Sequence, residues 1–198
     1  MGLDRTHDIQ RVYRKLLNCM SRPGVIENIS SESHKAGMTL EMSKHLLTVL
    51  FTVLDGEVTF NLPACNDKSL IKKINHLTYA KHAATDQADY IIITKTAGKA
   101  ELSEAFRQAK VGTLTDPHRS ATVILEAEAI TTGQQLALRG PGIEDKNYIC
   151  VTNSLDWVAI RQTKNNEFPL GIDMILLDET GQIACLPRTT QIQHQGVQ

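Results

Sequence analysis

The chain has 198 residues, a length that suits one domain with a substantial hydrophobic core. Hydrophobic residues make up 41% of it and charged residues 22%, which is typical of a globular protein and excludes a disordered or fibrous one. Lysine and arginine number 21, against 22 aspartates and glutamates. This balance gives no electrostatic reason to expect binding to nucleic acid or to a membrane surface.

The cysteines and the apolar segments indicate where the protein works. Four cysteines are spread along the chain without a C-x-x-C pair, so neither a zinc ribbon nor a redox motif is indicated. So few cysteines in a chain of this length favour a reducing compartment. Residues 1–11 are polar and charged, unlike a signal peptide, and the longest apolar-rich run, 46–54, is too short to cross a membrane. We expect a cytoplasmic protein.

The first half of the chain alternates predicted helices and strands. Apolar residues recur every three or four positions over 5–20, which predicts a helix with Asp4 or Thr6 as its N-cap. The segment S-R-P-G ends this helix, because proline restricts the residue before it and Gly24 tolerates a positive φ. Five further elements are predicted in order: a short strand over 25–29, a helix over 39–54, a strand over 58–60, a short helix over 67–77 and a buried strand over 89–94.

The second half adds hairpins to this alternation. The predicted elements are a helix over 99–110, a loop beginning at Gly112, a strand over 121–128, a hairpin partner for that strand at Q-L-A-L-R (135–139), a weaker helix over 154–162 and a final hairpin with its turn at 178–182. This order predicts an α/β fold, a three-layer α/β/α sandwich with a mixed sheet, in a single domain over 1–198. The Gln-rich tail, 191–198, is expected to be frayed and flexible, or ordered by a partner.

No local motif indicates a metal site or an activated nucleophile. The seven histidines are scattered, and the spacing of His76 and His82 does not place two ligands on one helical face. The chain has no G-x-S-x-G, and no cysteine or serine lies beside a recognisable base. We therefore expect no metal held by this chain and leave its catalytic residues unassigned.

Three arginines lie next to turn-forming residues: Arg22 in S-R-P-G, Arg139 in R-G-P-G and Arg188 in P-R-T-T. The planar guanidinium offers two parallel donors to a phosphate or a carboxylate, and Thr189 and Thr190 add hydroxyl donors beside the third arginine. The glycines of R-G-P-G could present backbone N–H groups to an anion, although glycine and proline are also ordinary turn residues. The alternative is that each arginine pairs with a carboxylate at the edge of the sheet or in an interface.

Asp173 lies at the start of a strand whose next residues, M-I-L-L, are expected to be buried. A carboxylate in this position must be capped, paired or functional, because an unpaired buried charge is costly. The turn at 178–182 reverses the chain, so Asp173 and Arg188 should return to the same end of two paired strands. The sequence therefore predicts that they form an ion pair or share a polar pocket.

Six segments in order along the chain resemble the H subunit of the carbon–phosphorus lyase system, the PhnH family. They are M-S-R-P-G-V (20–25), L-T-V-L-F-T-V-L-D-G-E-V-T (47–59), G-T-x(3)-P-x-x-S-A-T-x-I-L (112–125), L-R-G-P-G-I (138–143), F-P-L-G-I-D (168–173) and P-R-T-T (187–190). The resemblance extends from the first helix to Thr190. Its most specific parts are the last two segments with a hairpin between them.

This resemblance implies a role in bacterial phosphonate use. The family's H subunit works with the G and I subunits, and with the J subunit in the core complex. The G, H and I subunits are linked to a step in which a phosphonate displaces the adenine of ATP, giving α-D-ribose 1-methylphosphonate 5-triphosphate. The I subunit is the better candidate for that chemistry. MgATP is thus a substrate of the whole complex, and no cofactor is expected on this chain.

The resemblance also implies a fold like the large domain of type I pyridoxal-phosphate transferases, without the cofactor, and a homodimer when the subunit is isolated. Two main hypotheses follow. In the first, the chain is a non-catalytic scaffold whose exposed sheet edge or apolar patch docks partners. In the second, it binds substrate or takes part in catalysis, with Arg188, Thr189, Thr190 and Asp173 facing one pocket and Arg139 as a further candidate for substrate binding. An active pyridoxal-phosphate enzyme is a third, remote alternative. Arg22 is left out of any mechanism, since the family position need not be basic.

Overall fold

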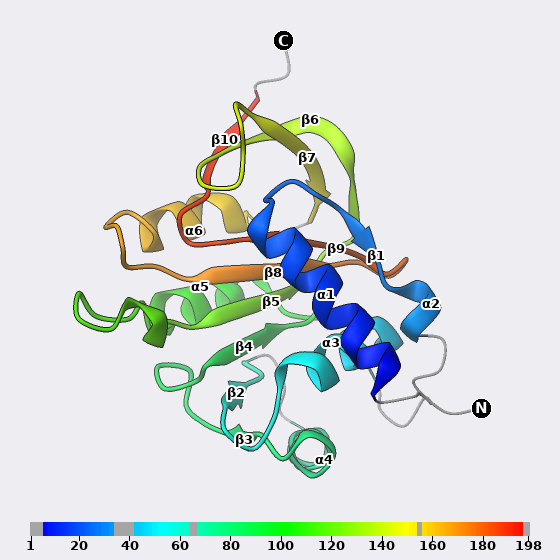
Figure 1. Cartoon of the computed structure of the whole chain (residues 1–198). Helices are drawn as coiled ribbons and strands as arrows, with labels where there is room; N and C mark the ends of the chain where they lie inside the picture. Colours follow the sequence, from blue (N-terminus) through cyan, green and yellow to red (C-terminus); the bar gives the residue numbers. More distant parts are fainter. Residues whose placement is uncertain (1–5, 34–41, 64–66, 154–155, 196–198) are drawn as a thin grey trace.

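A computed structural model describes residues 6–33, 42–63, 67–153 and 156–195, and it has an α/β fold (Figure 1). The helices are α1 (His7–Ser21), α2 (Ser30–Ser33), α3 (Lys44–Val53), α4 (Lys68–Thr78), α5 (Lys99–Gln108) and α6 (Trp157–Lys164), with a 3-10 turn η1 (Pro117–Arg119). The strands are β1 (Glu27–Asn28), β2 (Thr59–Asn61), β3 (Lys81–His82), β4 (Tyr90–Ile93), β5 (Thr122–Glu126), β6 (Ala129–Arg139), β7 (Asn147–Thr152), β8 (Asp173–Leu177), β9 (Gln182–Leu186) and β10 (Gln191–His194).

Seven strands form the main sheet, in the order β1-β9-β8-β5-β4-β2-β3. The ladders from β8 through β5, β4 and β2 to β3 are parallel, whereas β9 pairs antiparallel with both β8 and β1. The mixed sheet predicted from the sequence is therefore confirmed. The strand at each edge of this sheet, β1 on one side and β3 on the other, is only two residues long.

A second, three-stranded antiparallel sheet has the order β10-β6-β7 and lies above the main sheet in Figure 1. This corrects the prediction that the segment 135–139 pairs with 121–128. Both sides of β5 are already occupied by β4 and β8, so β6 leaves the main sheet and pairs with β7 and β10 instead. Strand β7 was not predicted.

The tail also departs from expectation, because residues 191–194 form β10, which pairs with β6 from Gln191 opposite Arg139 to His194 opposite Leu136. A segment paired with a neighbouring strand is not frayed, so that part of the prediction is wrong for residues 191–194. Residues 196–198 of the predicted tail lie outside the described residues.

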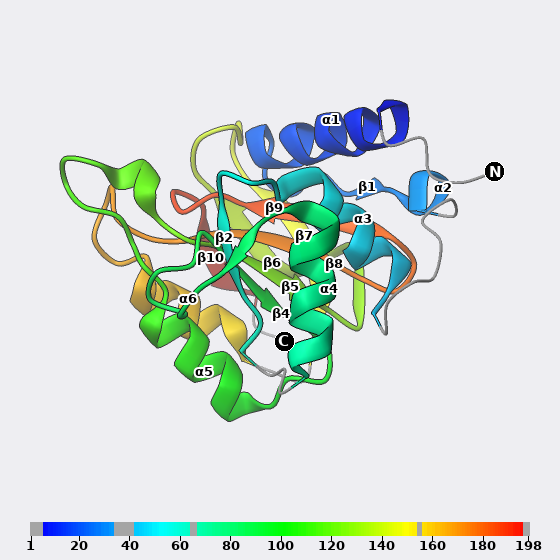
Figure 2. The same cartoon turned by 90° about the horizontal axis from the view of Figure 1, so that it is seen from below.

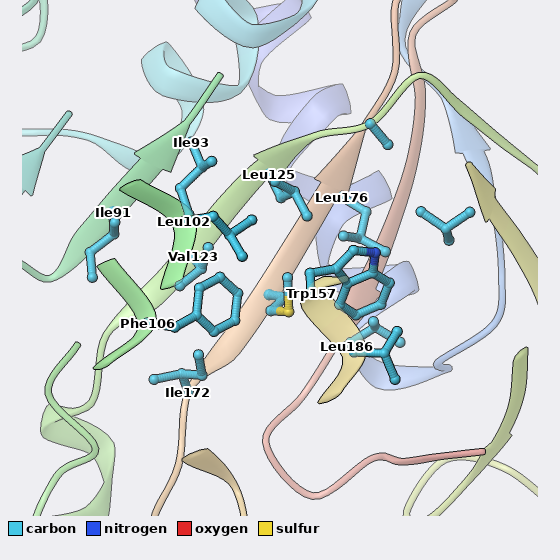
Figure 3. Packing of buried hydrophobic residues seen from close by; sticks show 14 of the residues in the cluster. Ile91, Ile93, Leu102, Phe106, Val123, Leu125, Trp157, Ile172, Leu176 and Leu186 are labelled. Atoms are coloured by element: carbon cyan, nitrogen blue, oxygen red, sulfur yellow. The ribbon is translucent and has the colours of Figure 1, made fainter. Parts of the chain in front are cut away.

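The main sheet has a hydrophobic core on each face, because successive side chains of a strand point to opposite sides. In β5, for example, Val123 and Leu125 join one cluster and Ile124 joins the other. The first cluster is covered by α5, α6 and the second sheet, and the other by α1, α3 and α4. Figure 2 shows α1 and α5 on opposite sides of the sheet, and Figure 3 shows Trp157 and Phe106 within the first cluster.

The helices follow the predicted periodicity, and local chemistry fixes where they start. The predicted helix 39–54 begins at Lys44 because Ser43 is its N-cap, with its side chain accepting a hydrogen bond from the Leu46 N–H at 3.0 Å. Residues 39–41, 5 and 154–155 of the predicted helices lie outside the described residues. Within the described ranges, none of the helices has the length and apolar character of a membrane span.

The hairpin turn after β8 is anchored by Asp178, which is buried. Its carboxylate accepts hydrogen bonds from the backbone N–H groups of Thr180 and Gln182 and from the Thr180 hydroxyl, at 2.7–3.0 Å. It also accepts one at 2.9 Å from the N–H of Ile130 in β6. Asp178 therefore stabilises the turn, as expected for D-E-T-G, and in addition joins this turn of the main sheet to the second sheet.

We predict that Asp178→Ala lowers the free energy of unfolding by roughly 2–4 kcal/mol, because it leaves buried donors, including the Ile130 N–H, without an acceptor. Urea denaturation measures the change. Glu179→Ala is the matched control in the same turn, because Glu179 is exposed and, within the described residues, pairs with the exposed Lys95. Equal stability of the two variants would contradict the anchoring role.

Candidate functional site

Asp173 and Arg188 form the predicted ion pair, at the amino ends of β5 and β8. Asp173 is the first residue of β8 and lies opposite Thr122, the first residue of β5, while Arg188 follows the end of β9. The Arg188 Nη2 atom donates to Asp173 Oδ2 at 2.8 Å, and Nε donates to Oδ1 at 3.3 Å. The backbone N–H of Arg188 also donates to Oδ1, at 2.7 Å. Both side chains are 19% exposed.

The third guanidinium nitrogen of Arg188 is also engaged, because Nη1 donates to the backbone carbonyl of Pro117. Pro117 begins η1, in the loop that starts at Gly112. Arg188 therefore ties three segments together: the end of the hairpin, the start of β8 and the loop before β5. With a partner at every nitrogen, this guanidinium holds the fold in place rather than presenting an open fork to a ligand.

The other glycine-rich segments close on P-R-T-T from two sides. Gly171 of F-P-L-G-I-D has φ +144°, and a Cβ there would lie 2.8 Å from the Asn165 side-chain oxygen. Gly140 of R-G-P-G has φ +135°, and a Cβ there would lie 2.8 Å from the Thr189 carbonyl oxygen. Only glycine permits this backbone and this approach. Asn165 completes the junction, donating to the carbonyls of Ile172 and Arg188 at 3.0 and 3.2 Å.

The remaining predicted arginines stay at the periphery. Arg139 is exposed at the end of β6, beside Gln191, and does not line the cavity described next. Arg22 is exposed and bonds Asn18 within the end of α1. The structure thus brings Asp173, Arg188 and the two threonines together and leaves Arg139 outside the group.

A cavity of about 380 Å³ opens beside P-R-T-T. It is lined by Arg161, Gln162, Asn165, Asn166, Phe168, Leu170, Arg188, Thr189, Thr190, Gln191 and Ile192. The predicted residues Arg188, Thr189 and Thr190 are among them, whereas Asp173 is not. Their predicted role in substrate binding stays a prediction.

Sequence reasoning missed Arg161, which is 1% exposed in the wall of this cavity. Its Nη1 donates to the Thr190 carbonyl at 3.0 Å and its Nη2 to the Pro187 carbonyl at 2.6 Å. Burial lowers the pKa of this guanidinium to about 10, still well above neutral pH. The sequence did contain a sign of this position. Arg161 follows Trp157 and Val158 by one helical turn, on the apolar face of α6, where a charged side chain is rarely found without a structural or functional role.

A larger cavity, of about 500 Å³, lies between α5 and the segments after β2 and β3. Its wall carries Glu101 and Glu104, and no lysine or arginine lines it among the described residues. Hydrogen bonding from Arg107 lowers the pKa of the Glu104 carboxyl to about 2, so this carboxylate stays negative at neutral pH. Such a wall repels anions and leaves the smaller cavity as the candidate for an anionic ligand.

Comparison with known proteins identifies relatives over nearly the whole chain. Residues 3–193 match the family model described as bacterial phosphonate metabolism protein (PhnH). A protein of Rhizobium meliloti (strain 1021) named alpha-D-ribose 1-methylphosphonate 5-triphosphate synthase subunit PhnH is 32% identical, covering 97% of this chain and 94% of its own. A protein of Stutzerimonas stutzeri named putative C-P lyase subunit protein HtxG is 28% identical, covering 94% of this chain and 87% of its own.

We predict that Asp173 and Arg188 stabilise the fold as a coupled pair. In a double-mutant cycle of Asp173→Ala and Arg188→Ala, each single change leaves a partly buried charge unpaired, so the coupling energy should be about 1–3 kcal/mol. Urea denaturation of the four proteins measures it. The same cycle on the exposed pair Glu104 and Arg107 is the control and should show no measurable coupling. Additive effects at Asp173 and Arg188 would contradict this coupling.

Proposed function

This chain belongs to the PhnH family of bacterial phosphonate metabolism proteins, and from that membership we propose that it is an accessory subunit of the phosphonate-activating machinery. The reaction is the displacement of adenine from ATP by methylphosphonate, which yields α-D-ribose 1-methylphosphonate 5-triphosphate. The relative from Rhizobium meliloti carries the name of a subunit of that synthase. In this proposal the chain supports assembly of the complex, and another subunit performs the bond-breaking step.

The observation that carries the accessory role is that the predicted substrate-binding residues Asp173 and Arg188 bind each other. Arg188 is bound by both Asp173 carboxylate oxygens and by the Pro117 carbonyl. A residue that binds a transferring phosphoryl group must have donors directed at that group. These donors are instead directed at the protein itself. This supports a structural role for the pair over the alternative in which it binds substrate within a catalytic subunit.

The proposed partners are the G, I and J subunits of the carbon–phosphorus lyase complex, in the cytoplasm, with a homodimer in isolation. A subunit needs a surface that its partners cover, and α1 offers two apolar side chains one turn apart: Tyr13 is 49% exposed and Leu17 is 50% exposed. The likeness to the large domain of type I pyridoxal-phosphate transferases stays a prediction, as does the absence of a cofactor on this chain.

We expect this chain alone to release no adenine from ATP and methylphosphonate, and its omission from a mixture with the G and I subunits to lower adenine release about 100-fold or more. Chromatographic quantification of adenine measures both. Turnover by the isolated chain, or full activity of the G and I subunits without it, would overturn the accessory role.

We further expect Arg188→Ala to lower the yield of assembled complex and the total activity in the same proportion, because the bonds of Arg188 to Asp173 and Pro117 shape the subunit. Size-exclusion chromatography gives the yield, and the adenine assay gives the activity per assembled complex. Arg107→Ala, which removes an exposed arginine, is the matched control and should change neither. Normal assembly of Arg188→Ala with an activity loss of about 100-fold would favour the substrate-binding alternative instead.

A further inference from the structure

The cavity beside P-R-T-T contains a buried positive charge that the described protein does not neutralise. Arg161 is 1% exposed, and no ion pair joins it to a carboxylate in the described part of the chain. Its guanidinium donates to the carbonyls of Thr190 and Pro187, which are neutral dipoles. They satisfy N–H groups but do not cancel the charge. A buried cation in this state is costly unless an anion accompanies it.

Asp173 cannot supply that anion by itself, because it is already committed to Arg188. It acts on Arg161 only at longer range, where it favours the charged form of the guanidinium. Among these three side chains, two guanidinium groups and one carboxylate leave one positive charge in excess. The burial that lowers the pKa of Arg161 to about 10 does not remove that charge at neutral pH.

The rest of the cavity wall has the chemistry of an oxyanion site. Its lining residues include Arg161 and Arg188 but no aspartate or glutamate. The Gln162 and Asn165 amides donate to backbone carbonyls, which leaves the Asn166 amide after α6 and the hydroxyls of Thr189 and Thr190 as further donors from two segments of the wall. Two buried polar atoms of this wall, Arg161 Nε and Thr190 Oγ1, have no hydrogen-bond partner among the described residues. Buried polar groups without partners are rare, and they point to a missing ligand or solvent molecule.

From these contacts we propose that the cavity binds a tetrahedral oxyanion, the phosphonate or phosphate group of a small ligand. Arg161 supplies the attracting charge and Thr190 a hydroxyl donor. Donors placed on several sides suit the three oxygens of a phosphonate better than the planar carboxylate, and about 380 Å³ accommodates a ligand of several heavy atoms. This ligand site goes beyond the accessory role, because a scaffold requires no ligand. Adenine release tests the accessory role, whereas ligand titration tests the site.

The test is isothermal titration of the purified full chain with methylphosphonate, inorganic phosphate and acetate. We expect methylphosphonate and phosphate to bind saturably and to compete with each other, with affinities of about 1 mM or tighter, and acetate to bind at least about 10-fold more weakly. The ratio of the first two affinities identifies whether the cavity favours phosphonate or phosphate. Absence of saturable binding for both, or equal binding of acetate, overturns the proposal.

Variants locate the binding in this cavity. Asn166→Asp places a negative charge in the exposed part of the wall without changing side-chain size, and it should weaken methylphosphonate binding about 10-fold or more. Gln10→Glu adds the same charge on α1 and is the matched control, expected to change binding less than about 2-fold. Equal effects of the two variants would show that net charge, not this cavity, governs binding, and would overturn the proposal.

Thr190→Val removes the hydroxyl at nearly constant volume and should weaken binding about 5- to 30-fold, since hydrogen bonds to charged groups are stronger than neutral ones. Arg161→Gln should abolish measurable binding. Because Arg161 is also part of the fold, circular dichroism and thermal unfolding accompany that variant, and a folded Arg161→Gln protein that binds methylphosphonate normally overturns the proposal. If this variant does not fold, the Thr190 and Asn166 variants decide the question alone.

Discussion

The bond network of Arg188 is the constraint on which the amino-terminal end of the main sheet depends. One guanidinium contacts the start of β8, through Asp173, and the loop before β5, through the Pro117 carbonyl, and its own backbone belongs to the segment that leaves β9. The close approach of Gly140 and Gly171 to this segment follows from the same arrangement. The family's separate motifs thus become neighbours in space because they build one junction.

This junction lies at an unusual end of an α/β sheet. Ligands of such sheets generally bind beyond the carboxyl ends of the parallel strands. Here Asp173 and Thr122 start their strands, so the cavity beside P-R-T-T lies at the amino ends. At the opposite end, Asp178 is directed at backbone N–H groups and joins the two sheets. The carboxyl end therefore carries the Asp178 junction and the larger cavity with its glutamate-bearing wall, and the amino end carries the cavity beside P-R-T-T.

Features encoded by neighbouring residues could be predicted from the sequence, and those that depend on distant partners could not. The pairing of Asp173 with Arg188 follows from the register of one hairpin, and the helices follow from their periodicity. The departure of β6 from the main sheet depends on β4 and β8 occupying both sides of β5, which no local pattern reports. The place of Arg161 depends likewise on how α6 packs against the segment 187–190.

The two-residue strands at the edges of the main sheet limit how this protein associates with others. An edge strand recruits another chain by offering a row of unpaired backbone groups, and longer rows recruit more strongly. Glu27–Asn28 and Lys81–His82 each offer a very short row, and three of these four side chains are polar and capable of carrying charge. Growth of the sheet into a continuous ribbon across subunits is therefore disfavoured. Contacts at these two edges therefore have to use side chains, whose sequence decides which protein is accepted.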